Sequence, residues 1–385
     1  MAENTLTSLA ADIYVAADKV GRELVGMIPA VKVNSGSEGA AKDDTVRAHV
    51  APTVTPTTLT PAMTIPEGTG QTIGNKTMTL DTMETVEIPF TGEGIKSLNN
   101  GAGFETVYGD MIAQAMRAHV NAIETKLVLA GRAAACRAFG TAGTTPFGTA
   151  NDYTAASNVL KILKDNGAGA FDNQLVINTA SGANFLGKQS AVNSAGTDSI
   201  LRQGVLLDLA GMPVRESGQL GQHTAGTAAS ATTDNAGYAI GATTITLASV
   251  GTGTILAGDV VTFAGDTNQY VVATGDADVS DGGTIVLKSP GLRVAMSAAT
   301  KAITMIATHS DNLAFARSAI ELAIRPPADP VGGDDAEDNM IVTDPHSGLA
   351  FSISVYKGRK KAMIAVDALY GVNVWNDDHV ALLIG

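Results

Sequence analysis

Large aromatic side chains are scarce in this sequence. Phe, Trp and Tyr together account for 4% of its 385 residues, and charged residues account for 16%. A monomeric protein of this length usually has more aromatic residues in its core and more charge on its surface. Small residues take their place, including 42 glycines. This composition favours a subunit whose surface meets other subunits, in a chain long enough for roughly two or three domains.

Cysteine is almost absent, since Cys136 is the only one. A single cysteine excludes an intramolecular disulfide and a zinc site built from cysteines. We expect Cys136 to be a small buried residue in a reducing compartment, because neither a histidine nor a helix start lies beside it to activate the thiol.

A secretion signal and a membrane-spanning stretch are also missing. The first residues, "MAENTLTSLAADIYV", include acidic side chains where a signal peptide is basic. No apolar run reaches the roughly 20 residues that cross a bilayer. We therefore expect a protein that is made in the cytoplasm and has no membrane partner.

Positive charge is in deficit. The chain has 25 Lys and Arg against 38 Asp and Glu, a formal net charge of −13. A protein that binds duplex DNA needs clustered cations to displace counterions from the phosphates. The one compact basic run is "KGRKK" at 357–361. It is either a solvated strand or turn, or a local contact for phosphate or an acidic partner, and specific DNA binding is not expected.

Motifs that carry chemistry are absent as well. The six histidines are scattered, and no nucleophile elbow, phosphate-binding loop or complete dinucleotide fingerprint occurs. In "DADVSDGGT", Asp276 and Asp278 match the first ligands of a calcium loop, but Ser280 and Asp281 stand where the third ligand and the glycine belong. We therefore assign no catalytic residue, cofactor or metal ligand. An enzyme with dispersed catalytic residues is the third hypothesis for function.

Two segments have the apolar spacing of helices. Residues 5–28 predict an amphipathic helix that ends before Pro29. Residues 104–130 repeat apolar side chains over roughly seven turns, which predicts a long strut helix. His119 lies near that apolar stripe, and we interpret it as a structural histidine because no ligand-type residue completes a pair with it.

Residues 34–90 favour extended structure. Prolines at 52, 56, 61 and 66 exclude helix. The following stretch "KTMTLDTMETVEIPF" alternates apolar and polar residues, which predicts a long two-stranded hairpin with a glycine-rich tip near 68–74. A lone hairpin is marginally stable in water. We therefore expect another chain to brace it.

The remainder contains a mixed domain interrupted by a β-rich module. Residues 151–222 alternate predicted helices and strands. Residues 223–306 contain the short strands "TTITLAS", "DVVTFAG", "QYVVATG", "TIVLKSP" and "AITMIAT", which is typical of a barrel or sandwich. The pattern after residue 306 returns to the style of the mixed domain. The β module is therefore predicted to be an insertion.

Three segments resemble one protein family. "LAGMPVRESGQLGQHTAG" resembles the stretch that enters an inserted domain, "LAGDVVTFAG" resembles a strand pair within it, and "ALYGVNVWNDDHVALLIG" resembles the closing segment. The family is that of the coat proteins of short-tailed phages of the phage P-twenty-two type, which have the Hong Kong 97 capsid fold. The order of the predicted parts is similar too.

The resemblance implies an α+β fold with an inserted all-β barrel. It divides the chain into an N-terminal arm at 1–33, an extended-loop hairpin at 34–95, a peripheral domain with the spine helix at 96–150, the first part of an apical domain at 151–223, the inserted β-barrel domain at 224–306, and a return through the apical and peripheral domains at 307–385.

The function implied by the resemblance is that of a major capsid protein, not an enzyme. Its copies would assemble as pentamers and hexamers into an icosahedral shell that encloses phage double-stranded DNA and touches it only non-specifically. A scaffolding protein, a portal protein and, in some shells, a decoration protein would be its partners. Assembly would take place in the cytoplasm of the bacterial host, and the product would be the virion capsid. The alternative is a multi-domain β-rich adhesion or surface protein.

Six residues are candidates for contacts between subunits. Four form the apolar face of the hairpin and two are acidic residues of the N-terminal helix: Met78, Leu80, Val86, Ile88, Asp12 and Asp18. A neighbouring copy would cover the apolar face. The two acidic residues would meet a basic scaffolding protein, or they are solvated charges of the helix.

Overall fold

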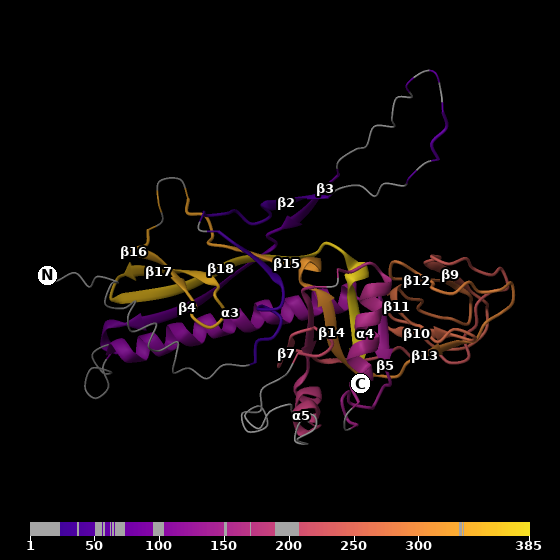
Figure 1. The fold of residues 1–385 in the computed structure, drawn as a ribbon. Coiled ribbons are helices and arrows are strands. Elements are labelled where there is room, and N and C mark those ends of the chain that lie inside the picture. The colour runs from indigo at the N-terminus through magenta and orange to yellow at the C-terminus, as the bar shows by residue number, and fades with distance from the viewer. Residues whose placement is uncertain are drawn as a thin grey trace.

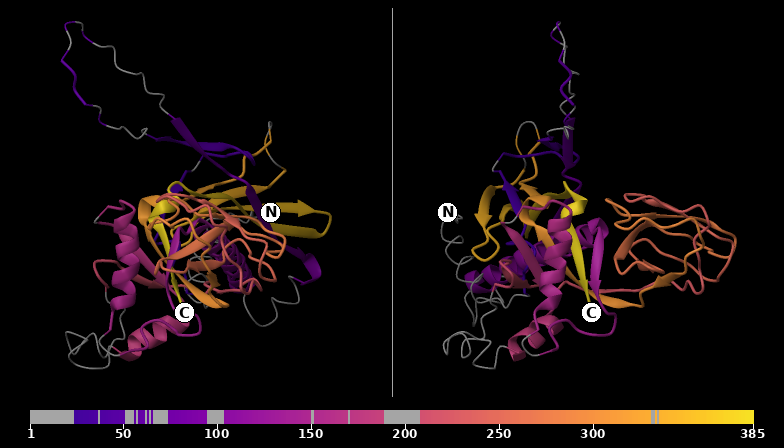
Figure 2. Two further views of the ribbon diagram at one scale, coloured as in Figure 1. Left: turned by 90° about the vertical axis from the view of Figure 1, so that its right-hand side faces the viewer. Right: turned by 45° about the vertical axis from the view of Figure 1, so that its right-hand side comes forward.

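The computed structural model describes residues 24–36, 38–50, 56, 58–61, 63, 65, 74–94, 104–149, 152–169, 171–188, 208–330, 333 and 335–385. A long helix, α3 (Phe104–Ala134), runs along the body between two β-sheets. An extended arm and an inserted β-sheet project from this body in different directions (Figures 1 and 2). Within the described ranges, no helix is both long and apolar enough to cross a membrane.

The first sheet has six strands around the long strand β18. β1 pairs with β15 in parallel, and every other pair is antiparallel. β4 covers one edge of β18, whereas β17 and β15 follow one another along the other edge. The strands are β1 (Lys32–Ser35), β15 (Ile320–Arg325), β18 (Lys361–Val374), β17 (Ala350–Gly358), β16 (Asp338–Thr343) and β4 (Thr82–Thr91).

The second sheet brings together segments that lie far apart in the chain. Its central strands run in the order β5-β19-β14-β6-β7, with β8 paired to β14. The neighbours β5 and β19, and likewise β6 and β7, are parallel. The strands are β5 (Arg137–Gly140), β19 (Val380–Ile384), β14 (His309–Ala316), β6 (Asn173–Ile177), β7 (Val214–Glu216) and β8 (Gln222–His223).

Helices cover both faces of this second sheet. Successive side chains of a strand point to opposite faces. Leu313 and Phe315 of β14 accordingly pack in one cluster with α3, whereas Ala314 between them packs in another. That other cluster includes α4 (Thr154–Asp165) and α5 (Thr179–Lys188). The 3-10 turns η1 (Arg317–Ala319) and η2 (Asp377–His379) precede β15 and β19.

The predicted strut helix is confirmed over 31 residues. The buried side of α3 differs slightly from the predicted stripe, because Met111 is 43% exposed while the adjacent Ile112 is fully buried. His119 is a structural histidine as expected: its ring is 2% exposed, stacks on Phe351 at 5.8 Å, and its Nε2–H donates to the Val366 carbonyl at 2.9 Å.

The inserted module has a core of its own. All five predicted strands are present, in the order β13-β10-β11-β12-β9. They form an open half barrel, so the fold is confirmed as α+β while a closed barrel is not. The strands are β9 (Thr244–Leu247), β10 (Val260–Phe263), β11 (Gln269–Thr274), β12 (Gly283–Leu287) and β13 (Ile303–Met305). β11 also pairs with β5, which joins the module to the body.

The arm consists of two antiparallel strands, β2 (Thr45–Val50) and β3 (Gly74–Thr79). The continuous strand expected through residues 76–90 is divided at Leu80 and Asp81. The physical reason is that β3 pairs with β2, whereas β4 changes partner and pairs with β18. The hairpin is thus built from β2 and β3 alone, and β4 belongs to the body.

The N-terminal helix expected at 5–28 falls almost entirely outside the described residues. Its described end, from residue 24 to residue 28, is not helical but forms extended chain and a turn. The expected helix is wrong at this end because the N–H groups of Gly26, Met27 and Ile28 donate to the Glu124 carboxylate. These groups therefore make no helical hydrogen bonds.

Candidate assembly surfaces

The arm presents apolar side chains that its own chain leaves uncovered. Leu59 is 89% exposed, Ile65 is 95% exposed and Met63 is completely exposed. These residues lie between β2 and β3 in the sequence, outside the β2–β3 ladder. Three large apolar side chains that are almost completely exposed on one extended stretch are available for contact with another chain. The arm is therefore the first candidate assembly surface.

The sequence did not single out these three residues, because the prolines around them argue against a regular strand. They are isolated apolar residues between prolines and threonines. The available signal is their even spacing, which places Leu59, Met63 and Ile65 on one side of an extended chain.

The hairpin residues predicted to contact a neighbour lie mostly inside the chain's own core. Met78 and Leu80 are each 1% exposed and pack against Ala323 and Leu369 of the body. Ile88 is 4% exposed and belongs to the main core. Side chains this deeply buried have no area left for a second subunit, so they anchor the arm.

Val86 is the exception among the predicted hairpin contacts. It is half-buried and lies beside the exposed part of α3. The two predicted acidic contacts, Asp12 and Asp18, lie outside the described residues. A contact of Val86, Asp12 or Asp18 with another chain stays a prediction.

The base of the arm is held to the body by backbone and side-chain bonds. The Leu80 N–H donates to the Asp44 carbonyl at 2.9 Å, and the Asp43 N–H donates to the Leu80 carbonyl at 2.8 Å. Lys126 on α3 forms an ion pair with Asp81, just before β4. The Lys126 ammonium outweighs partial burial and lowers the pKa of Asp81. The point where the arm leaves the body is thus fixed in place.

A buried carboxylate on α3 fixes the segment that leads into the body from the N-terminus. Glu124 is fully buried. It accepts the N–H groups of Gly26 and Met27 at 2.7 Å and of Ile28 at 3.0 Å. It also accepts the Ser217 hydroxyl at 2.7 Å. A carboxylate with several charge-assisted hydrogen bonds is stable without a cation beside it.

Gly26 is required at this point by close packing. A Cβ atom there would lie 2.6 Å from the Glu216 carbonyl oxygen, which is too close for any side chain. Sequence reasoning missed both residues. The available signal was the charge of Glu124 within the stripe formed by Val120, Ile123 and Leu127, since an acid in an apolar helix face needs a partner.

A second buried carboxylate ties three distant segments together. Glu321 on β15 is 4% exposed. It accepts hydrogen bonds from Lys32 at 3.2 Å, from the Asn34 amide at 3.2 Å and from the Trp375 indole at 2.7 Å. The strand β1 is thereby fastened to β15 and to the chain just after β18. Glu124 and Glu321 thus connect segments of the body that lie far apart in the sequence.

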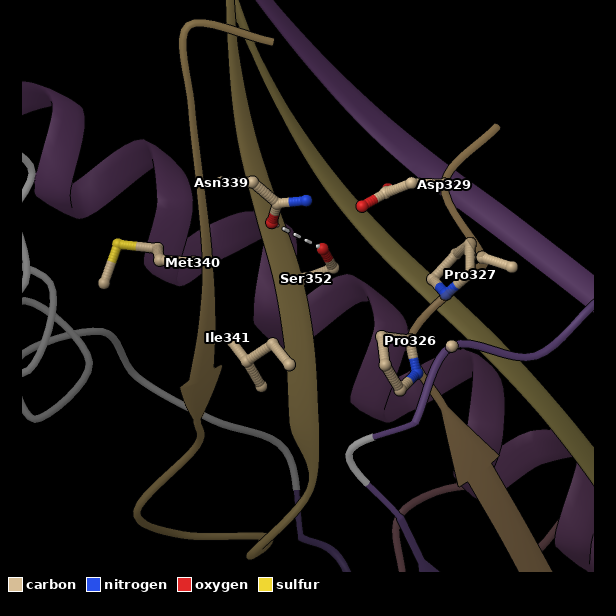
Figure 3. A pocket seen from close by; sticks show the side chains of 9 residues that line it. Pro326, Pro327, Asp329, Asn339, Met340, Ile341 and Ser352 are labelled. Carbon is tan, nitrogen blue, oxygen red and sulfur yellow. Dashed lines mark hydrogen bonds between the residues drawn. The ribbon is translucent and has the colours of Figure 1, made fainter. Parts of the chain in front are cut away.

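Two grooves on the body are large enough to accept part of another chain. One, of about 500 Å³, lies between β4 and α3 and is lined by Val86, Met111 and Ala118 among others. The other, of about 610 Å³, separates Pro326 and Pro327 from the strands β16 and β17. Figure 3 shows the prolines and Asp329 on one side of it, facing Asn339 and Ser352 on the other.

The basic run at 357–361 forms the exposed turn between β17 and β18. Lys360 has a left-handed backbone with φ of 59°, and Lys357 forms an ion pair with Glu337. The expected solvated turn is confirmed. A further contact of these cations with phosphate or an acidic partner stays a prediction.

The aspartates of the incomplete calcium motif stabilise a turn. The Asp278 N–H donates to Asp276 Oδ1 at 2.9 Å, and Ser280 donates its N–H and hydroxyl to Asp278 Oδ1. These bonds from Ser280 lower the pKa of Asp278. The described ranges contain no cluster of three or more potential metal ligands.

No protein-family model matches the sequence, and no curated protein matches it. Solved structures do match over nearly the whole length. The capsid of the cyanophage P-SCSP1u has 12% sequence identity and a TM-score of 0.51, with 94% of this chain and 89% of that chain covered. Two further matches have lower TM-scores. Mycobacterium phage Che8 has 13% identity, 96% and 90% coverage and a TM-score of 0.45, and the mature capsid of bacteriophage PhiM1 has 11% identity, 94% and 88% coverage and a TM-score of 0.46.

The first of these similarities defines the class of fold. The chain has the α+β fold of the Hong Kong 97 capsid type, with a long helix, two sheets and a projecting arm. The chain is similar in this respect to the capsid protein of the cyanophage P-SCSP1u. At 12% identity the similarity establishes the fold, and the function is argued next.

Proposed function

We propose that this chain is a major capsid protein whose copies assemble into an icosahedral shell around phage double-stranded DNA. The observation that carries the proposal is the fold, which matches a cyanophage capsid over 94% of the chain. A shell subunit needs surfaces that bind other copies, and it does not need a catalytic group. The exposed arm and the grooves of the body are surfaces of that kind.

The arm is the principal contact between copies in this proposal. Leu59, Met63 and Ile65 are uncovered, whereas Met78 and Leu80, next to the body, are buried. A neighbouring copy supplies the missing cover. Because the arm is one surface and its receptor is another, the contact is heterologous, and repeated heterologous contacts form a ring when the rotation between copies closes. Pentamers and hexamers are rings of this kind.

The buried residues at the base of the arm fix the arm to the body. A subunit held through a projecting arm transmits force to the point where that arm joins the body. Met78 and Leu80 fill that joint with apolar contacts, and Glu124 and Glu321 hold the neighbouring segments. We therefore assign the predicted contact residues Met78, Leu80 and Ile88 an anchoring role, and the arm beyond residue 50 the contact itself.

The narrower assignment is the short-tailed phage type represented by phage P-twenty-two. Its support is the inserted β-rich module between β8 and β14, together with the quoted sequence resemblance. We propose that the segment around Thr232 and Thr233 closes the half barrel, because its bridges to Ala302 and Leu247 lie between the two edge strands. The six segments given under Sequence analysis are the proposed divisions of the chain.

Other copies of the chain are the principal partners. A scaffolding protein during assembly, a portal protein at one vertex and a decoration protein in some shells complete the proposed set, and the packaged DNA is touched only non-specifically. The net charge of −13 supports this last point, because a surface with excess negative charge repels phosphate. Assembly in the bacterial cytoplasm and residence in the virion follow from this function.

Light scattering coupled to size-exclusion chromatography tests the proposal. We expect the purified chain, concentrated at neutral pH, to form particles with the mass of complete rings or shells. Addition of a scaffolding protein should increase their yield and narrow their size distribution. A chain that stays monomeric at high concentration, with and without the scaffolding protein, contradicts the proposed function.

A further inference from the structure

Opposite charges lie side by side at the end of the body that is opposite the inserted module (Figure 1). The turn between β17 and β18, which we call the basic turn, has four exposed cations: Lys357, Arg359, Lys360 and Lys361. The stretch that leads into β16, which we call the acidic stretch, contains Asp335, Glu337 and Asp338. The two are neighbours because β16 begins beside the end of β17, where the Glu337 N–H donates to the Val355 carbonyl at 2.8 Å.

One ion pair joins the two segments, between Lys357 and Glu337. It is the only ion pair that the described residues provide for the basic turn, so the other three cations of the turn face solvent unpaired. The acids at the two ends of the acidic stretch, Asp335 and Asp338, likewise have no cation within ion-pair distance among the described residues. Each subunit therefore presents unpaired charge of both signs on adjacent segments.

The carboxylates around the basic turn make it a poor site for phosphate. Glu337 and Asp338 lie on the β16 side. On the β4 side, the Gly92 N–H donates to the Lys360 carbonyl at 3.3 Å, and the next residue is the exposed Glu93. Phosphate would be attracted by the cations and repelled by the carboxylates on both sides of them. A second copy of the chain fits better, because it has both an acidic stretch for the cations and a basic turn for the acids.

We propose that this end of the body is a contact between copies, in which the basic turn of one copy binds the acidic stretch of another. The inference rests on the proposed function, and it adds a second contact to that of the arm. The arm supplies exposed apolar side chains, whereas the charged end supplies an attraction that acts over a longer range.

This attraction has a particular role because whole copies repel one another. Each copy has a formal net charge of −13. A local pairing of opposite charges offsets that repulsion and orients the approaching copies, which increases the association rate. A single exposed ion pair contributes little, so we expect the charges of the two segments to act together. The contact therefore determines mainly how fast, and in which orientation, copies meet.

Assembly kinetics of full-chain variants, followed by light scattering at neutral pH, test the contact. Arg359→Glu with Lys360→Glu makes both segments acidic. In about 0.01 M salt, where the Debye length is about 30 Å, we expect this variant to assemble at least about tenfold more slowly than the unaltered chain. In about 1 M salt, where the Debye length is about 3 Å, the difference should disappear. Lys161→Glu with Lys164→Glu, at exposed cations of α4, changes the net charge by the same amount and is the matched control, which should assemble at close to the unaltered rate.

A charge swap completes the test. Asp335→Lys and Asp338→Lys are added to Arg359→Glu and Lys360→Glu, so that the turn becomes acidic and the stretch becomes basic. Because the two segments are again complementary in every pair of copies, we expect most of the lost assembly rate to return. Damage to the fold by the first two substitutions would not be reversed by two more.

Three results overturn the contact and leave the proposed function standing. One is an unaltered assembly rate of the Arg359→Glu, Lys360→Glu variant in low salt, another is a control variant that is slowed as much, and the third is a charge swap that restores nothing. An unaltered rate together with weaker binding of duplex DNA by the first variant would assign the cations to DNA instead. Failure of the unaltered chain itself to assemble would contradict the proposed function, and this contact with it.

Discussion

The arm and the inserted module both project from the body, and the module has an apolar core of its own. The module surrounds a core that includes Phe263, Tyr270 and Ile285, each no more than 2% exposed. In the described outer part of the arm, the large apolar side chains Leu59, Met63 and Ile65 are exposed instead. The two projections therefore differ in where the free energy that orders them comes from.

This difference indicates which projection depends on assembly. Burying a large aliphatic side chain stabilises a protein by about 1.5–3 kcal/mol. The module gains this within one chain. For Leu59, Met63 and Ile65 the same gain becomes accessible only when another chain covers them. In the proposed function, the described outer arm is therefore the part of the molecule that gains most from contact with another copy.

The largest expected effect is the loss of assembly after changes at the outer arm. Replacing Leu59, Met63 and Ile65 together by serine removes the apolar area that we assign to the contact. We expect assembled particles to disappear in sedimentation, while the free energy of unfolding of the monomer stays within about 0.5 kcal/mol of the original value. Thr58→Ser with Thr60→Ser is the control on the same stretch. Normal particles from the triple variant would show that the arm is not the principal contact.

The next effect concerns the body, where buried Glu124 holds segments of the same chain together without help from another copy. Glu124→Leu leaves the N–H groups of Gly26, Met27 and Ile28 without their acceptor. We expect the free energy of unfolding to fall by about 3–5 kcal/mol, as measured by chemical denaturation, because unsatisfied buried groups are costly. Glu93→Gln, at an exposed glutamate, should change it by less than about 0.5 kcal/mol. Equal stability of the two variants would refute the anchoring role.

A smaller and more local effect is expected inside the module. Ile285→Ala creates a cavity in its core and should destabilise the module by about 2–4 kcal/mol. Trp375, the only tryptophan, reports on the body, so its fluorescence transition should stay in place while hydrogen exchange in the module increases. Ile240→Ala, at a side chain that is 67% exposed, is the control. A matching shift in the Trp375 transition would mean that module and body unfold together.

The smallest effect concerns the reactivity of a thiol next to the pairing of β5 with β11, where the module meets the body. Cys136 lies just before β5, the strand that pairs with β11 of the module. Burial raises the pKa of its thiol to about 11. Because only the thiolate reacts, alkylation at pH 8.5 should be at least about a hundredfold slower than for a free cysteine. Rapid alkylation of the folded chain, measured by mass spectrometry, would show that the region around Cys136 and the β5–β11 pairing opens to solvent.

Local periodicity predicted the elements whose signal lies within one segment. The spacing of apolar residues located α3, and short runs of β-branched residues located every strand of the module. It could not locate the division between β3 and β4, because alternation continues through Leu80 while the pairing partner changes. That partner, β18, lies almost 300 residues further along the chain.

The candidate site was less accessible to sequence reasoning for a related reason. Alternation identified Met78, Leu80 and Ile88 as one apolar face, but it does not say whether the cover comes from the same chain or from a neighbour. The anchor at Glu124 depends on backbone N–H groups nearly a hundred residues away, which leave no pattern in side-chain types. The exposed residues of the outer arm are evenly spaced, but the prolines among them argue against a regular strand.

Electron microscopy of the assembled chain tests the central claim most directly. The full chain should be assembled at neutral pH, with and without scaffolding protein, beside the variant in which Leu59, Met63 and Ile65 are serine. We predict closed shells of uniform diameter for the unaltered chain and dispersed subunits for the variant. Dispersed monomers from the unaltered chain under every condition would contradict the account, because a subunit of this kind has to bind its own copies.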